Sequence, residues 1–163
     1  MKLSYNRFFF YIFIIISIFF LDRLSKLYVL NYASANEQVN IVINDFLNII
    51  LIWNKGIGFG FFSFDNNKVY NFITFLILTI NLLIIYLIIK SDKIRSLFYV
   101  IILGGSLGNL FDRFYYTAVP DFIDLNYKGF HWFIFNIADI FISLGIICLI
   151  CFEFLDYKKN NNV

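Results

Sequence analysis

Two carboxylates in the C-terminal third of the chain, Asp121 and Asp139, have the residue type and setting for acid–base chemistry. Asp139 lies near the start of an apolar run that ends at Phe152, where a charge is costly unless it is paired or takes part in chemistry. Asp121 lies in the polar connection just before this run. Two carboxylates held close together at low dielectric cannot both ionise, so they share one proton. The ionised group can activate water while the protonated group polarises a carbonyl, which is peptide hydrolysis of the aspartic type.

Metal and nucleotide chemistry have less support in the sequence. His131 is the only histidine, so a His-rich metal site is excluded and we expect no metal. Cys148 and Cys151 lie about one helical turn apart in the last apolar run, and we interpret them as small buried side chains rather than a redox pair. The glycine-rich segment 104–109 lies inside an apolar run rather than after a strand, so it does not indicate a nucleotide-binding loop.

A serine mechanism stays open beside the aspartic one. Ser106 or Ser25 would be the nucleophile and Lys26 the base, and such a protease would survive the loss of Asp121. A non-catalytic membrane chaperone or small transporter is a further alternative, and it would tolerate Asn at both acids.

The composition places these residues in a membrane. The chain has 163 residues, enough for one domain over 1–163. Its apolar fraction of 61%, charged fraction of 15% and mean hydropathy of +0.78 lie outside the range of soluble globular proteins. The charges are gathered between long apolar runs, which a biased amino-acid usage alone would not produce.

Four apolar runs are long enough to cross a bilayer as helices. We expect spans over approximately 8–30, 69–89, 96–114 and 132–154. The first run resembles a signal peptide, but Asp22, Arg23 and Lys26 separate it from the small residues that could be cleaved, so we expect it to be retained. Asp22 and Lys26 are four residues apart and can pair on a helix.

The connection between the first two spans has its own pattern. Residues 39–43 and 46–52 read as two short strands joined by a turn. Gly56, Gly58 and Gly60 then alternate with larger residues, which suits either a close approach of backbone to a ligand or a flexible linker. The predicted fold is an all-α membrane protein with four transmembrane helices and a small extracytoplasmic β element.

The distribution of basic residues predicts the orientation. The termini and the turn at 90–95 carry seven Lys and Arg against three acids, whereas the remaining segments carry six bases and eight acids. The positive-inside rule then places both termini in the cytoplasm and both larger connections outside. Asp22, Asp112 and Asp139 would all lie within about 10 Å of the outer hydrocarbon boundary, with Asn109 and Asn136 at the same level. Pairing at helix ends accounts for Asp22 and Asp112 but not for Asp139.

At these positions the chain resembles the bacterial lipoprotein signal peptidases (signal peptidase II). Five separated motifs spread over most of the chain carry the resemblance: Asp22 with Ser25 and Lys26, Asn54 to Gly60, Gly104 to Arg113, Val119 to Phe122, and Phe135 to Asp139. The departures are Ser25 where the family often has Thr, Gly58 where it often has Ala, and Ser106 where Ala is usual.

The resemblance implies a membrane aspartic endopeptidase that cuts diacylglyceryl-modified prolipoproteins just before the lipidated cysteine. It implies a site at the outer leaflet of the bacterial cytoplasmic (inner) membrane, membrane lipids and the lipid-modified precursor as partners, and no cofactor, metal or nucleic acid. The family's catalytic pair maps onto Asp121 and Asp139. Its binding and orienting positions map onto Asn54, Gly56, Asn109, Arg113 and Asn136, and its structural support onto Asp22, Lys26 and Asp112.

Overall fold

The computed structural model of the chain describes residues 4–36, 39–56, 67–127 and 130–161. Within them lie four long helices: α1 (Tyr5–Asn36), α2 (Asn67–Lys90), α3 (Lys93–Tyr116) and α4 (Ile137–Asn161). Each helix is long and apolar enough to cross a membrane, so the prediction of four spans is confirmed. Large apolar side chains such as Phe13, Phe72 and Phe154 are exposed on the outer helix surfaces, as expected for surfaces that face lipid.

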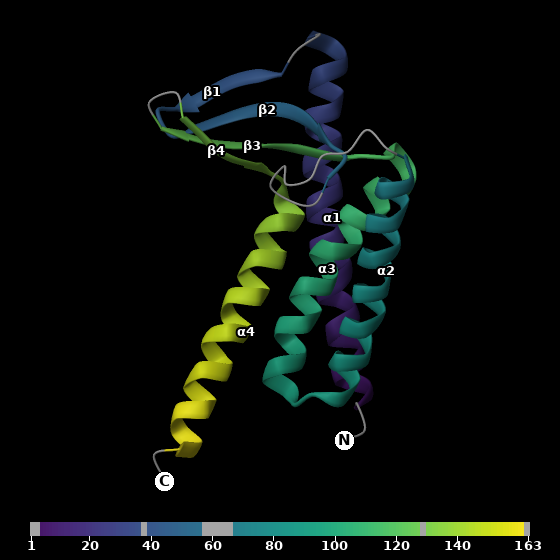
Figure 1. The fold of residues 1–163 in the computed structure, drawn as a ribbon, viewed down its shortest axis with the longest axis vertical. Helices are drawn as coiled ribbons and strands as arrows, with labels where there is room; N and C mark the ends of the chain where they lie inside the picture. The colour runs from purple at the N-terminus through teal and green to yellow at the C-terminus, as the bar shows by residue number, and fades with distance from the viewer. Residues whose placement is uncertain (1–3, 37–38, 57–66, 128–129, 162–163) are drawn as a thin grey trace.

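Helix α3 is the centre of the bundle and packs against α1, α2 and α4 (Figure 1). Helix α4 starts beside α3 and leans away from the bundle toward its C-terminal end. Glycines on α3 permit close approach on two sides. A Cβ at Gly105 would lie 2.5 Å from the carbonyl oxygen of Ala138 on α4, and a Cβ at Gly108 would lie 2.5 Å from Oδ2 of Asp22 on α1. The close packing predicted for this glycine-rich segment is therefore present.

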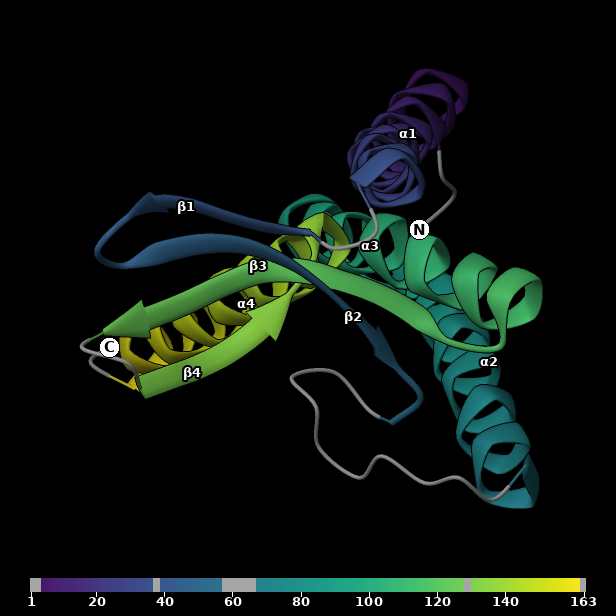
Figure 2. The ribbon, with the colours of Figure 1, turned by 90° about the horizontal axis from the view of Figure 1, so that it is seen from above.

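An open four-stranded antiparallel sheet covers one end of the helices (Figure 1). Its strands follow the order β1 (Asn40–Asn44), β2 (Leu47–Asn54), β3 (Val119–Tyr127) and β4 (Phe130–Phe135). The predicted pair of strands after the first span is confirmed as β1 and β2. Seen from above, β3 and β4 lie over α4, while α1 rises at one side of the sheet (Figure 2).

The second half of the sheet differs from the sequence prediction. We expected residues 114–132 to be a polar connection and the fourth span to begin near residue 132. Instead the segment 119–127 is β3, residues 130–135 are β4, and α4 begins at Ile137. The apolar run 130–135 pairs with β3, and a short apolar run does not by itself distinguish a strand from the first turns of a helix.

Ion pairs join α3 to α4 at the helix ends that lie away from the sheet. Asp92 caps α3 by accepting hydrogen bonds from the backbone N–H groups of Ile94 and Arg95. The Arg95 side chain contacts Asp92 at 2.5 Å, Glu153 at 2.5 Å and Asp156 at 2.7 Å. These pairs are partly exposed, so they fix the approach of α4 more than they add stability.

Candidate active site

A buried network of charges joins α1 to α3 just below the sheet. The Lys26 ammonium donates to Oδ2 of Asp22 at 2.7 Å, to Oδ2 of Asp112 at 2.6 Å and to Oδ1 of Asn109 at 2.9 Å. Asp22, Lys26 and Asp112 are each 0% exposed. The expected pairing of Asp22 with Lys26 is confirmed. Asp112 pairs with Lys26 and with Arg23, not with its neighbour in the sequence.

Asp22 also links this network to α4. Its second carboxylate oxygen accepts a hydrogen bond from the backbone N–H of Ala138 at 3.0 Å. Ala138 lies in the first turn of α4, where backbone N–H groups have no partner within the helix and where the helix dipole favours a negative charge. Asp22 therefore holds the start of α4 directly beside Asp139.

The start of α4 is closed by a reciprocal pair of hydrogen bonds. Oδ1 of Asn136 accepts from the Asp139 N–H at 3.2 Å, and Oδ2 of Asp139 accepts from the Asn136 N–H at 3.1 Å. This is the arrangement of a capping box, with the acid three residues after the capping residue. The other oxygen of Asp139 accepts from Nδ2 of Asn109 at 2.8 Å, so both oxygens of this carboxylate are fixed.

Asp121 reaches the same place from the sheet. Its Oδ2 accepts from Nδ2 of Asn54 at 2.8 Å, and its Oδ1 accepts from Nδ2 of Asn136 at 2.6 Å. The register between β2 and β3 shifts between Ile49 and Ile52, next to the position opposite Asp121, and such irregularities can re-aim a side chain. Asn136 thus contacts both carboxylates, through its side chain for Asp121 and through its backbone for Asp139.

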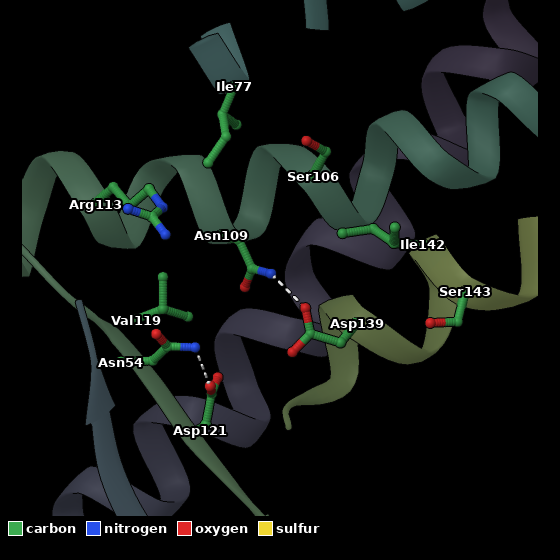
Figure 3. Close-up of a pocket in the computed structure, with 10 residues that line it drawn as sticks. All are labelled: Asn54, Ile77, Ser106, Asn109, Arg113, Val119, Asp121, Asp139, Ile142 and Ser143. Carbon is green, nitrogen blue, oxygen red and sulfur yellow. Dashed lines mark hydrogen bonds between the residues drawn. The ribbon is translucent and has the colours of Figure 1, made fainter. Parts of the chain in front are cut away.

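Both acids line one cavity of about 250 Å³, together with five other polar side chains on its walls (Figure 3). The cavity is lined by Asn54, Ile77, Ser106, Asn109, Arg113, Val119, Asp121, Asp139, Ile142 and Ser143. Asp121 is 2% exposed, and this burial, followed by the charge of Asp139, raises the pKa of Asp121 from 3.8 to about 7. A carboxyl that carries a proton near neutral pH beside a second carboxyl has the properties of an acid–base pair.

Arg113 holds the start of the glycine-rich connection against the cavity. Its guanidinium donates to the carbonyl oxygen of Gly56 and lies over the ring of Tyr70 at 5.3 Å. Oδ1 of Asn54 accepts from the Gly56 N–H at 2.8 Å, so Asn54 contacts both the loop and Asp121. Gly58 and Gly60, which alternate with larger residues after Gly56 in the sequence, lie outside the described residues.

Within the described residues, the structure brings together the positions that the sequence suggested for the acids, for the binding and orienting groups and for their support. Four further residues on the cavity wall were not singled out as site residues, namely Ile77, Val119, Ile142 and Ser143. Ser143 follows Asp139 by four residues and so shares its helix face, a signal that the sequence did contain. The contribution of Arg23 to the buried network was missed, because nothing in the sequence indicated that its partner would be Asp112.

The geometry disfavours the serine alternative. Three acceptors surround the Lys26 ammonium, so it is a buried structural cation rather than a free base. The Ser25 hydroxyl donates to the backbone oxygen of Asp22 at 2.7 Å, within its own helix. Ser106 lies on the cavity wall.

Four spanning helices and a buried pair of carboxylates under a small sheet define an integral membrane protein whose cavity holds two acids. A family model described as "Signal peptidase (SPase) II" matches residues 14–155. The chain therefore belongs to the signal peptidase II family, and it is a multi-pass bacterial membrane protein with peptidase activity.

Known relatives support this assignment over nearly the full length. A lipoprotein signal peptidase of Pelagibacter ubique is 50% identical over 161 residues, covering 98% of this chain and 97% of the relative. That of Anaplasma marginale is 34% identical over 148 residues, covering 89% and 84%. Among solved structures, a bacterial membrane enzyme determined by the in meso method at 2.3 Å resolution superposes with a TM-score of 0.75 at 29% identity, covering 91% of this chain and 90% of that one.

The buried network predicts the effect of removing Asp22. Asp22→Ala leaves the Lys26 ammonium with a missing partner in a buried position, and losing one member of a buried ion pair costs about 3–5 kcal/mol. We expect a large drop in the yield of folded protein in the membrane, measured by abundance and by thermal unfolding in detergent. Activity per folded molecule should change less than the yield.

The matched control is Asp156→Ala, which breaks a partly exposed pair with Arg95 and should cost about 1 kcal/mol or less. A normally abundant but inactive Asp22→Ala protein would contradict the structural role and move Asp22 into the catalytic group.

Proposed function

We propose that this protein is an aspartic endopeptidase that removes signal peptides from diacylglyceryl-modified prolipoproteins, with Asp121 and Asp139 as its catalytic pair. Membership of the signal peptidase II family supports signal-peptide removal from prolipoproteins. One observation carries the assignment of the pair: Asn136 hydrogen-bonds to both carboxylates, which line a single cavity. No other pair of acids in the described residues lines this cavity.

In this mechanism the pair carries one proton. The ionised carboxylate takes a proton from a water molecule as its oxygen attacks the scissile carbonyl carbon. The protonated carboxyl gives its proton to the carbonyl oxygen, which produces a neutral tetrahedral intermediate. Collapse of the intermediate breaks the C–N bond, the leaving amine takes up a proton from the first carboxyl, and the second carboxyl recovers its own. The pair returns to its starting state without a metal or cofactor.

Four polar side chains surround this pair: two orient the carboxylates and two line the wall beside them. Asn109 and Asn136 fix the orientation of the carboxylates, as their hydrogen bonds indicate. Arg113 and Asn54 line the cavity at its sheet end. The Nη1 atom of Arg113 is buried and has no hydrogen-bond partner in the described part of the chain, so it can donate to a peptide carbonyl group. Asp22, Lys26 and Asp112 act through these residues rather than on the substrate.

The orientation in the membrane follows from the charges. Basic residues gather at the helix ends that lie away from the sheet (Figure 1), namely Arg7, Lys90, Lys93, Arg95, Lys158 and Lys159. The positive-inside rule places these ends and both termini in the cytoplasm. The sheet and the two acids then lie at the outer leaflet of the cytoplasmic membrane, the level at which a lipid-anchored cysteine is held.

The acid pair generates a direct test. Asp121→Asn and Asp139→Asn each preserve side-chain size, but the new amide nitrogen cannot accept the hydrogen bond that one carboxylate oxygen accepts. The loss of one such bond costs about 1 kcal/mol, so the protein should still insert and accumulate. Neither variant can exchange a proton at that position, and we expect cleavage of a lipidated precursor to fall by at least about 10³-fold. Turnover is measured as release of the signal peptide by purified protein in detergent.

The control for this test is Ser25→Ala, which should cleave at a rate close to that of the wild type. Substantial turnover by either Asn variant would exclude the aspartic pair. Loss of turnover in Ser25→Ala with survival of Asp121→Asn would favour a serine mechanism.

The raised pKa of Asp121 predicts a pH dependence. Because its pKa lies at about 7 in the fold instead of 3.8, the folded state binds this proton more tightly than the unfolded chain does. The stabilisation is complete below about pH 4 and is lost as the pH rises through about 7, by up to about 4 kcal/mol. Asp121→Asn cannot ionise, so it should unfold at a higher temperature than the wild type at pH 8 and at a similar temperature near pH 4.

Thermal unfolding in detergent from pH 4 to pH 8 measures this difference in unfolding temperature. Cleavage by the wild type should decline as the pH rises above 7. Parallel stability curves for the wild type and Asp121→Asn would contradict the shared proton.

The depth of the acids predicts a dependence on the substrate's lipid. A diacylglyceryl group holds the scissile bond at the outer-leaflet boundary, and each buried methylene contributes ~0.8 kcal/mol to that attachment. A precursor with an unmodified cysteine should therefore be cut at least about 100-fold more slowly, since four methylenes already correspond to that ratio. The measurement compares lipidated and unlipidated forms of one precursor in bilayers. Equal rates for the two forms would mean that the enzyme recognises the peptide and not its lipid.

A further inference from the structure

Two hydroxyl groups lie on the cavity wall on the side away from the sheet. Ser106 on α3 precedes Asn109 by three residues, and Ser143 on α4 follows Asp139 by four. Since α3 runs toward the sheet and α4 runs away from it, both serines lie about 4–6 Å deeper along the helices than Asn109 and Asp139. Their neighbours on the wall are Ile77 and Ile142, so this deep end is otherwise apolar (Figure 3).

Both hydroxyls are available to a ligand. Neither takes part in a hydrogen bond with any described part of the chain, and both side chains are half-buried rather than fully enclosed. Ser106 and Ser143 come from two helices and line one cavity, whereas the Ser96 hydroxyl of α3 donates to the backbone oxygen of Ile88. A hydroxyl both donates and accepts, so the pair can serve either a peptide N–H or a peptide carbonyl.

A peptide that is cut at this depth in the membrane needs hydrogen-bonding groups of this kind. A signal peptide crosses the bilayer as a helix, and its scissile bond becomes accessible to attack only where the helix has unwound. Unwinding frees backbone N–H and C=O groups at a depth where water does not satisfy them, and non-helical backbone at membrane depth persists only where protein supplies partners. The segment before the scissile bond comes from the bilayer side and therefore enters the deep end of the cavity.

We propose that Ser106 and Ser143 form a subsite that hydrogen-bonds the unwound backbone of the signal peptide about two residues before the scissile bond. The position follows from length, because an extended chain advances about 3.3 Å per residue and the hydroxyls lie about 4–6 Å below the acids. Ile77 and Ile142 line the same end of the cavity and would flank this segment. The inference rests on the proposed function and adds to it two residues that bind the signal peptide, the part of the substrate that is released.

The test uses two lipidated substrates that share the residues after the scissile bond. The long one carries a full signal peptide, and the short one carries a single blocked residue before the lipidated cysteine, which does not reach the deep end. Ser106→Ala and Ser143→Ala should each lower kcat/KM on the long substrate by about 3- to 10-fold, the usual effect of one lost hydrogen bond. On the short substrate both variants should match the wild type, and Ser17→Ala on α1 is the control for a serine lost elsewhere in the membrane.

The comparison of substrates separates the outcomes. Equal losses on both substrates would indicate a general structural effect and overturn the subsite, and so would the absence of any loss on the long substrate. Complete loss of activity in Ser106→Ala on both substrates would point to a serine nucleophile and also overturn it. Turnover by Asp139→Asn in the same assay would instead contradict the aspartic mechanism, so failure of the subsite and failure of the proposed function remain distinguishable.

Discussion

The ammonium of Lys26 is the interaction on which the rest of this structure depends. A fully buried cation in a membrane helix is tolerated only with opposite charge beside it, and here Asp22 and Asp112 lie at 2.7 and 2.6 Å. These contacts fix the rotation and depth of α1 against α3. Asp22 extends the constraint through the N–H of Ala138 to the first turn of α4, one residue before Asp139. The position of a proposed catalytic carboxylate is thus set by an ion pair on two other helices.

Charge balance then favours one protonation state of the acids. Arg23 and Lys26 offset Asp22 and Asp112 within the buried network, so this layer carries no net charge. The remaining buried cation at this level in the described residues is Arg113, on the wall of the cavity that holds the two acids. With one shared proton the pair carries a single negative charge, which Arg113 offsets. A second ionisation would leave an unpaired charge in a low-dielectric site, consistent with the raised pKa of Asp121.

The parts that the sequence predicted are those governed by local pattern. The four spans follow from runs of apolar residues, and the pairing of Asp22 with Lys26 follows from their spacing on one helix. Strand β4 was missed because 130–135 is mostly apolar and only Asn136 separates it from α4, so only its pairing with β3 reveals its conformation. The partner of Asp112 was also missed, since tertiary packing rather than adjacency decides it. Counting residues along the spans predicted the depth of Asp139, and Asp121 was expected to reach it from the outer connection. The position of Asn136 between the two acids depends on tertiary structure and could not be predicted from the sequence.

The two acids come from different kinds of backbone, and this has a physical reason. A carboxylate in the first turn of a helix gains from unpaired N–H groups and from the dipole, and Asp139 uses both through the capping pair with Asn136. A second carboxylate on the same face of that helix would lie one turn, about 5.4 Å, away along the helix axis. A strand that ends above the helices can approach from outside the hydrocarbon, with its own backbone groups satisfied by its sheet neighbours. The sheet therefore allows Asp121 to line the same cavity as Asp139 without a place on any of the helices.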